Sequence, residues 1–217
     1  MSLDIKTERA VDEFPEEPGV TDIAFVVEGR KIYTFKTILS IASPVFKAMF
    51  SSDFKEKSSK EIELPGKTYR DFEKFLMCLS PDKYLDLNEG MIERLLPLAK
   101  EYQVNSIIRR CEAWLLKEMN QREKCDKSME GEVKFLLKSY FYGSEYNMPK
   151  IRARTFKRLV RFKLRSYKSV QSYKELSEKD KIELLEARIN EVDSLYRYCQ
   201  YCDKSDYFLG RFELFKE

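Results

Sequence analysis

The sequence contains no histidine, and its seven glycines form no phosphate-binding motif. Without an imidazole, Ser-His-Asp and Cys-His catalysis are excluded, and so is every zinc site that needs a histidine ligand. The spacings Gly-x-Gly-x-x-Gly and Gly-x-x-x-x-Gly-Lys-Ser/Thr, with which loops bind dinucleotides and triphosphates, are absent. We therefore expect a protein that is not an enzyme and that has no cofactor.

Long apolar runs are missing as well, and cysteines are few. No run of about eighteen apolar residues occurs, and residues 1–8 lack a hydrophobic stretch, so we expect neither a membrane span nor a signal peptide. This favours the cytoplasm or the nucleus. Five cysteines suit a reducing compartment, where they act mostly as small buried side chains. Cys199 and Cys202 have a metal-like spacing, but too few further ligands exist, so we expect no metal site.

The composition that is present indicates a folded protein with balanced charge. Hydrophobic residues make up 43% of 217 residues, which is enough for a sizeable core in one large domain or two small ones. There are 40 basic and 37 acidic side chains, a net charge of +3. Because this is close to balance, the overall field does not select nucleic acid, and any electrostatic partner must be attracted locally.

The N-terminal third predicts a β-hairpin followed by short helices. Residues 1–20 contain Pro15, Pro18 and Gly19 among acidic residues. Because proline and glycine disfavour a stable helix, we interpret this segment as a flexible acidic arm. Residues 22–35 alternate in the manner of two strands, with a turn at Gly29. From Lys36 the spacing becomes helical, and Ser43 before Pro44 predicts an N-cap that starts a second helix.

A short strand and three further helices complete this part. Ile62 and Leu64 alternate with glutamates, and helices are predicted around residues 72–79, 91–102 and 107–117. The first two short helices carry more apolar surface than a small sheet can cover, so we expect a second copy to cover the excess. The fold class is therefore α+β for this region.

These residues resemble the BTB/POZ domain, a protein-interaction fold of a small β-sheet with flanking helical hairpins. The resemblance runs from about Asp22 to Met119, and we assign residues 21–119 to this domain. The family has an Asp at the start of the first strand, a His-Lys before the helices, and then Leu-x-x-x-Ser-x-x-Phe-x-x-Met-Phe. Here that last motif reads Leu39, Ser43, Phe46, Met49 and Phe50. Phe35 replaces the usual histidine, which marks a divergent member.

The resemblance also implies a homodimer and a docking loop. It places the dimer interface at Ile38, Leu39 and Ala42. In the adaptors of cullin-3 ubiquitin ligases, the loop after the helical hairpin carries a hydrophobic residue, any residue and then glutamate. Phe54, Lys55 and Glu56 match this pattern, and Asp53 precedes it. A cullin-binding role competes with the simpler one, in which Phe54 folds back onto its own helices and Glu56 caps or solvates the loop.

The second half predicts helical hairpins. Residues 101–107 recur as residues 145–151, with an aromatic residue at the end of one helix, an asparagine in the turn and an isoleucine in the next helix. We assign residues 120–130 to a junction and residues 131–217 to an all-helical region that resembles the BACK region of BTB adaptors. Ser177 is expected to cap another such helix, which contains Ile182, Leu184 and Leu185. The aromatic segment after Leu195 fits either a helix that packs or a partner surface.

Six basic residues recur at steps of three and four and predict one stripe along a helix: Lys150, Arg154, Arg158, Arg161, Arg165 and Lys168. No acidic residue interrupts the sequence from Asn147 to Lys174. A solvated helix face is the favoured interpretation, an acidic protein partner is the next, and nucleic acid is the least favoured because no base-stacking groups are interleaved.

We therefore expect a non-enzymatic adaptor that pairs through its BTB domain, docks a cullin-3 RING ubiquitin ligase and recruits a client protein. The client would be bound by the helical half, the arm or another subunit. Two alternatives stay open. One is a BTB dimerisation scaffold or assembly subunit without ligase binding, and the other is a nucleic-acid-associated BTB protein that uses the basic helix 150–168.

Overall fold

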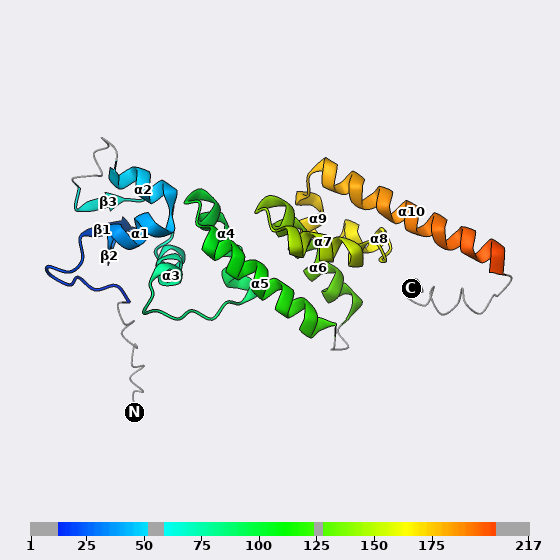
Figure 1. The fold of residues 1–217 in the computed structure, drawn as a ribbon, viewed down its shortest axis with the longest axis horizontal. Helices are drawn as coiled ribbons and strands as arrows, with labels where there is room; N and C mark the ends of the chain where they lie inside the picture. The colour runs from blue at the N-terminus through cyan, green and yellow to red at the C-terminus, as the bar shows by residue number, and fades with distance from the viewer. Residues whose placement is uncertain (1–12, 52–58, 124–127, 203–217) are drawn as a thin grey trace, which may run out of the picture. The chain divides into compact units, whose positions relative to one another are not determined.

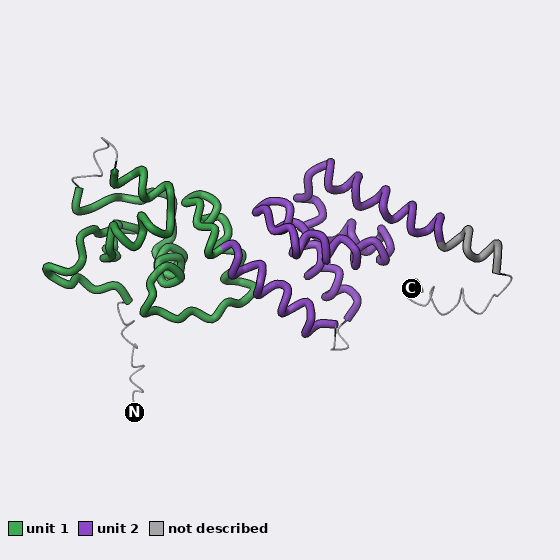
Figure 2. Tube along the Cα trace, viewed as in Figure 1, with its two compact units in different colours: residues 1–107 green, residues 108–217 purple. Residues whose placement is uncertain are grey.

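The computed structural model describes residues 13–51, 59–123 and 128–202, with side chains up to residue 194. The chain divides into two compact units, residues 1–107 and 108–217 (Figure 2). The first unit contains a small sheet with helices and the second is helical (Figure 1), which confirms the predicted α+β fold followed by a helical region. No helix within the described ranges is both long enough and apolar enough to span a membrane.

The sheet has three strands, β1 (Ile23–Val27), β2 (Arg30–Thr34) and β3 (Glu61–Glu63), in the order β2-β1-β3. β1 pairs antiparallel with β2 and parallel with β3. Glu28 and Gly29 form the hairpin turn with φ angles of 52° and 73°, a conformation that glycine adopts without steric cost. The predicted hairpin is confirmed.

Two short helices, α1 (Lys36–Ala42) and α2 (Pro44–Ser51), lie between β2 and β3 in the chain. The fully buried Ser43 separates them. Its hydroxyl accepts a hydrogen bond from the Phe46 N–H at 3.1 Å, which confirms the predicted N-cap. The same hydroxyl donates to the Tyr102 carbonyl oxygen at 2.6 Å. Ser43 therefore ties the start of α2 to the end of a helix that comes about sixty residues later in the chain.

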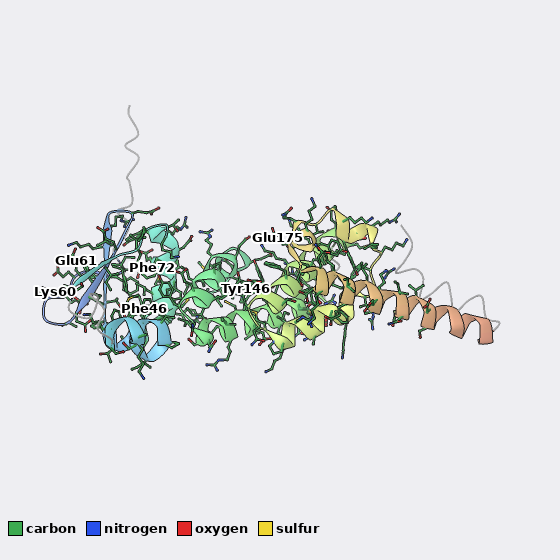
Figure 3. The ribbon with its side chains drawn as sticks, turned by 90° about the horizontal axis from the view of Figure 1, so that it is seen from above. Phe46, Lys60, Glu61, Phe72, Tyr146 and Glu175 are labelled. Atoms are coloured by element: carbon green, nitrogen blue, oxygen red, sulfur yellow. The ribbon has the colours of Figure 1, made fainter. Side chains whose placement is uncertain are left out.

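An aromatic cluster forms the core of the first unit, where α3 (Tyr69–Leu79) and α4 (Glu89–Glu101) complete the fold. The rings of Phe46 and Tyr102 stack with centroids 4.5 Å apart, and Phe25 lies 5.1 Å from Phe72 in an edge-to-face arrangement. Figure 3 labels Phe46 on α2 and Phe72 on α3. Such ring pairs add stability beyond the burial of their area, so they join strand, helices and Tyr102 into one core.

The segment before β1 is anchored to the sheet. Phe14 is buried, and its carbonyl oxygen accepts a hydrogen bond from the Tyr33 N–H at 3.3 Å. The Glu13 carboxylate forms an ion pair with Lys83 at 3.2 Å. The arm predicted for residues 1–20 is therefore packed against the domain at residues 13 and 14, a contact that its breaker-rich composition did not indicate.

The remaining helices follow one another through short connections. They are α5 (Asn105–Arg122), α6 (Met129–Glu145), α7 (Pro149–Leu159), α8 (Arg165–Lys168), α9 (Gln171–Glu175) and α10 (Glu178–Cys202). The boundary between the two compact units falls after Ile107, within α5. α5 extends to Arg122 and α6 begins at Met129, so the predicted junction 120–130 overlaps the ends of both helices.

The predicted internal repeat has the same helix-ending turn in both copies. Gln103 and Asn147 adopt left-handed conformations, with φ angles of 53° and 52°. The residue after each closes the turn, because the Val104 N–H donates to the Ala99 carbonyl at 2.7 Å and the Met148 N–H donates to the Gly143 carbonyl at 2.9 Å. This is a Schellman-type helix end, which satisfies carbonyl groups that the helix leaves open. The repeat is therefore structural as well as sequential.

Candidate functional site

The most exposed described aliphatic side chain of the first unit lies on α1. Ile41 is 83% exposed. It borders a shallow pocket of about 610 Å³ that is lined by Lys36, Thr37, Ser40, Ile41, Pro44, Lys47 and Phe50. We call these residues the α1–α2 surface. An apolar side chain this exposed, beside a hollow with a basic rim, is typical of a surface that another protein covers.

Lys36 fixes this surface to the sheet. Its N–H donates to the Asp22 carboxylate at 2.8 Å, so the aspartate before β1 holds the start of α1. The ammonium group donates to the Ser59 carbonyl oxygen at 3.1 Å and lies 5.7 Å from the centre of the Phe50 ring. Phe50 in turn stacks on the buried Phe46, with centroids 6.0 Å apart. The exposed surface is therefore built directly on the core.

The predicted dimer residues take different positions around this surface. Leu39 is a core residue, since its side chain is 1% exposed and has no area left for a partner. Ile38 and Ala42 are half-buried. Ile41, the most exposed aliphatic residue of α1, was not among the predicted dimer residues, because helical spacing alone does not distinguish which side of a seven-residue helix faces the sheet.

The four residues predicted to bind a cullin, Asp53, Phe54, Lys55 and Glu56, lie outside the described residues. The structure does describe both ends of their segment. α2 ends at Ser51, and the Ser59 carbonyl oxygen accepts the Lys36 hydrogen bond given above. The segment therefore begins and ends beside the α1–α2 surface.

The predicted basic stripe does not lie on one helix. α7 ends at Leu159 and α8 begins at Arg165, so the six residues divide between two helices and the connection between them. Arg154 and Arg158 also have acidic partners from other helices. Glu123 after α5 pairs with Arg154 at 3.2 Å and with Arg158 at 2.9 Å, and Glu132 of α6 pairs with Arg158 at 2.6 Å.

The other four residues of the predicted stripe lie toward its two ends. Arg161, Arg165 and Lys168 are exposed, and Lys150 is exposed at the start of α7. The carboxylate of Glu112 accepts hydrogen bonds from the backbone N–H groups of Lys150 and Ile151, at 2.8 and 3.1 Å, and so caps α7. A continuous phosphate-binding face is not formed, because acidic groups from α5 and α6 interrupt it.

A polar cluster in the second unit ties α10 to α6 and α7. The Arg152 guanidinium group pairs with Asp180 at 2.8 Å and with Glu183 at 2.7 Å, and it donates to the Tyr140 hydroxyl at 3.2 Å. Burial by itself would raise the pKa of Asp180, but hydrogen bonds from Arg152, Ser177 and Ser144 outweigh it and hold that pKa below its ordinary value. The charged groups of this cluster neutralise one another, since Arg152 pairs with both Asp180 and Glu183. We therefore interpret the cluster as structural.

No group of three or more histidine, cysteine, aspartate or glutamate side chains that could bind a metal ion occurs in the part of the chain that the structure describes. Cys78 is half-buried and Cys111 is buried, both as thiols. Cys199 and Cys202 belong to α10, and the structure describes their backbone but not their side chains. The structural role predicted for this pair stays a prediction.

Known proteins are similar in sequence to parts of this chain. The family model described as BTB/POZ domain matches residues 11–119. BTB and MATH domain-containing protein 36 of Caenorhabditis elegans is 29% identical over 110 residues, which cover 50% of this chain and 34% of that protein. Kelch repeat and BTB domain-containing protein 1 of Ectromelia virus is 27% identical over 176 residues, which cover 81% of this chain and 29% of that protein.

One solved structure, the BTB (Tramtrack and Bric a brac) domain of human gigaxonin, aligns with a TM-score of 0.36 and 25% identity, over 42% of this chain and 74% of that chain. The match to the family model begins before β1, in the segment that Phe14 anchors, and it ends at Met119 in α5. It spans half of the 217 residues. The chain belongs to the BTB/POZ domain family.

Proposed function

We propose that this chain is a non-enzymatic interaction adaptor of the cytoplasm or nucleus that pairs through its α1–α2 surface and docks a cullin-3 type ligase scaffold through Phe54 and Glu56. A client protein would be recruited by another part of the protein. Membership of a family of protein-interaction domains supports the adaptor role. The absence of histidine and of phosphate-binding motifs in the sequence agrees with it.

The observation that carries the proposal is the α1–α2 surface. Ile41 exposes 83% of its area beside a hollow, although the neighbouring Leu39 and Phe46 are fully packed. When a partner removes apolar area of this kind from water, the complex is stabilised by about 25 cal/mol per Å² of buried area. The segment with Phe54 begins at the end of α2, so a partner that covers one feature lies close to the other.

The relatives support a recruiting role for the longer proteins. The printed name of the viral relative joins BTB with Kelch repeats, and that of the nematode relative joins BTB with a MATH domain. This chain matches only 29% and 34% of these two proteins. A client-binding function is therefore proposed for the helical unit or for a partner subunit, and it is not carried over from either relative.

Calorimetric titration with the N-terminal region of cullin-3 tests the docking role. Exchange of Phe54→Ala together with Glu56→Lys should weaken binding at least tenfold, because a fully buried phenylalanine contributes about 1.5 to 3 kcal/mol. Lys55→Ala, at the position where the motif accepts any residue, is the matched control and should bind like the wild type. Unchanged affinity of the double variant rejects the assignment of these two residues.

A BTB scaffold without ligase binding is the second candidate, and the α1–α2 surface favours it independently of the docking segment. A wild-type chain that forms dimers but shows no heat of binding with cullin-3 would select this candidate. Its further partners would then be acidic proteins at the exposed end of the basic residues, Arg161, Arg165 and Lys168.

A further inference from the structure

Helix α10 has an exposed apolar face in addition to the face that packs on its own unit. Leu184 is fully buried, and the Arg188 guanidinium group donates to the Val160 carbonyl oxygen at 2.7 Å, so these two residues mark the packed face. Ile182, Ile189 and Val192 are 53%, 59% and 39% exposed. In Figure 1 the later turns of α10 extend beyond the other helices of the second unit.

The exposed residues have the spacing of a coiled-coil seam. Ile182, Leu185, Ile189 and Val192 follow one another at steps of three, four and three, and the sequence continues the pattern with Tyr196 and Cys199. Alternating steps of three and four give a period of 3.5 residues, which keeps one apolar line in contact with a second helix. Along this line lies an open groove of about 360 Å³, with Leu164 on its other wall.

The charges beside the seam select one arrangement of two such helices. Lys181, which also pairs with Glu178 of its own helix at 2.8 Å, and Arg188, whose guanidinium group has further N–H donors besides the one on Val160, flank it on the side of the helical body. Glu186 and Asp193 flank it on the other side. Two parallel copies in register bring Lys181 to Glu186 of the partner subunit and Arg188 to Asp193 of the partner subunit, since these positions lie five residues apart. An antiparallel pair would instead oppose like charges, so the pattern is self-complementary in the parallel arrangement.

The residue types agree with this arrangement. β-Branched residues in the first apolar position of each heptad and leucine in the second favour two-stranded parallel coiled coils. Ile182 and Ile189 occupy the first position and Leu185 occupies the second, while Val192 places a β-branched residue in the second position of the next heptad. We propose that α10 pairs in parallel with the α10 of a second copy of this chain, through a seam that includes Ile182, Leu185, Ile189 and Val192. This pairing is separate from the α1–α2 surface and does not depend on cullin binding.

Disulfide cross-linking of the full chain tests the seam. In a background of Cys125→Ser, Cys199→Ser and Cys202→Ser, a Val192→Cys variant should form a covalent dimer under mild oxidation, because the second apolar positions of a parallel pair face each other. Asn190→Cys, two residues away on the outer side, is the matched control and should yield at least tenfold less. Absence of the dimer from the Val192→Cys variant, or equal yield from both variants, overturns the proposal.

Two further variants separate this pairing from its alternatives. In the Val192→Cys background, Lys181→Glu and Glu186→Lys should each lower the yield several-fold, and their combination should restore it. Failure of the combination to restore the yield rejects the parallel register. Cross-linking should also persist when Ile41→Asp is added, and its loss there would show that α10 does not pair by itself, so failure at one surface is distinguishable from failure at the other.

Discussion

At the scale of single residues, Ser43 determines how the exposed helices are held on the core. It is the one residue that connects α1 to α2 in the chain, and its hydroxyl caps α2. The same hydroxyl donates a hydrogen bond to the Tyr102 carbonyl oxygen at the end of α4. A buried hydroxyl with two partners is costly to remove, because both partner groups then lose a hydrogen bond without regaining water. The sequence Ser-Pro predicted the cap, but the bond to Tyr102 depends on tertiary packing and was not predictable from local pattern.

Replacement of Ser43 by alanine should lower the free energy of unfolding by about 1 to 3 kcal/mol, because the Phe46 N–H and the Tyr102 carbonyl stay buried. Urea denaturation followed by circular dichroism measures the change. Ser40→Ala is the matched control: its hydroxyl only bonds back to the Lys36 carbonyl in the same helix, at 2.6 Å, and the change should stay within about 0.5 kcal/mol. Equal effects at the two positions would contradict the role given to Ser43.

Gly143 should tolerate no side chain. A methyl group there would lie 2.7 Å from the Arg152 Cβ and 2.8 Å from its Cα, so α6 and α7 would have to separate. Gly143→Ala should therefore destabilise the second unit by about 1 to 3 kcal/mol. Gly90→Ala is the control, because its nearest new contact is 3.6 Å and alanine in a helix is favoured by up to about 1 kcal/mol. Thermal denaturation should show opposite shifts for these two exchanges.

At the scale of elements, the helix and strand periods predicted most of the fold, and the end of α7 shows where they fail. Pro149 can start a helix, and residues 150–168 contain neither glycine nor proline. The local pattern therefore predicts one long helix. The structure ends α7 at Leu159, where the Tyr167 hydroxyl donates to the Leu159 carbonyl and Arg188 donates to the Val160 carbonyl. These donors satisfy the carbonyls that a helix end leaves open. Because one of them comes from α10, no sequence window around residue 160 contains the cause.

The same limit explains the basic residues. Acidic residues are absent from the segment itself, yet Glu123 and Glu132 neutralise Arg154 and Arg158 from α5's end and from α6. Helical spacing predicts which residues share a face, but not which face a neighbouring helix approaches. The exposed Ile41 escaped prediction for the same reason.

The attachment of α10 should weaken in acid. Arg152 and its partners hold the pKa of Asp180 below its ordinary value of 3.8, so the pair stabilises the fold above that pH, and the contribution is lost as pH falls through the lowered folded-state pKa. Arg152→Met should cost about 1 to 3 kcal/mol at pH 7 and progressively less as the pH falls below 3.8 and through the lowered folded-state pKa of Asp180. Denaturation at several pH values measures this difference.

Arg154→Met is the control for that experiment. Arg154 pairs with Glu123 at an exposed position, so its removal should cost less than about 1 kcal/mol at pH 7. A loss for Arg152→Met that does not change between pH 7 and pH 3 would contradict an ionic attachment of α10.

At the scale of the whole molecule, two apolar surfaces on one chain point to self-association. Exchange of Ile41 for aspartate should convert dimers to monomers in a chain that also carries Ile189→Asp, because α10 then cannot pair. Sedimentation velocity measures the mass. The Ile189→Asp variant alone should stay dimeric, and so should Tyr84→Asp with Ile189→Asp, since Tyr84 is 82% exposed on another part of the first unit. Dimers that persist after both exchanges would remove the α1–α2 surface from the assembly.

The parallel pairing of β1 with β3 has a consequence for the segment that precedes β3. Ala24, Phe25 and Val26 hold Glu61, Ile62 and Glu63 in register, and the Lys36 ammonium group donates to the Ser59 carbonyl oxygen, so the C-terminal stem of this segment is attached to the domain, while its N-terminal stem is the end of α2 at Ser51. Lengthening a loop between anchored stems costs only about 0.6 kcal/mol for each doubling. An engineered insertion between Ser51 and Ser59 should therefore leave the register of β1 and β3 intact.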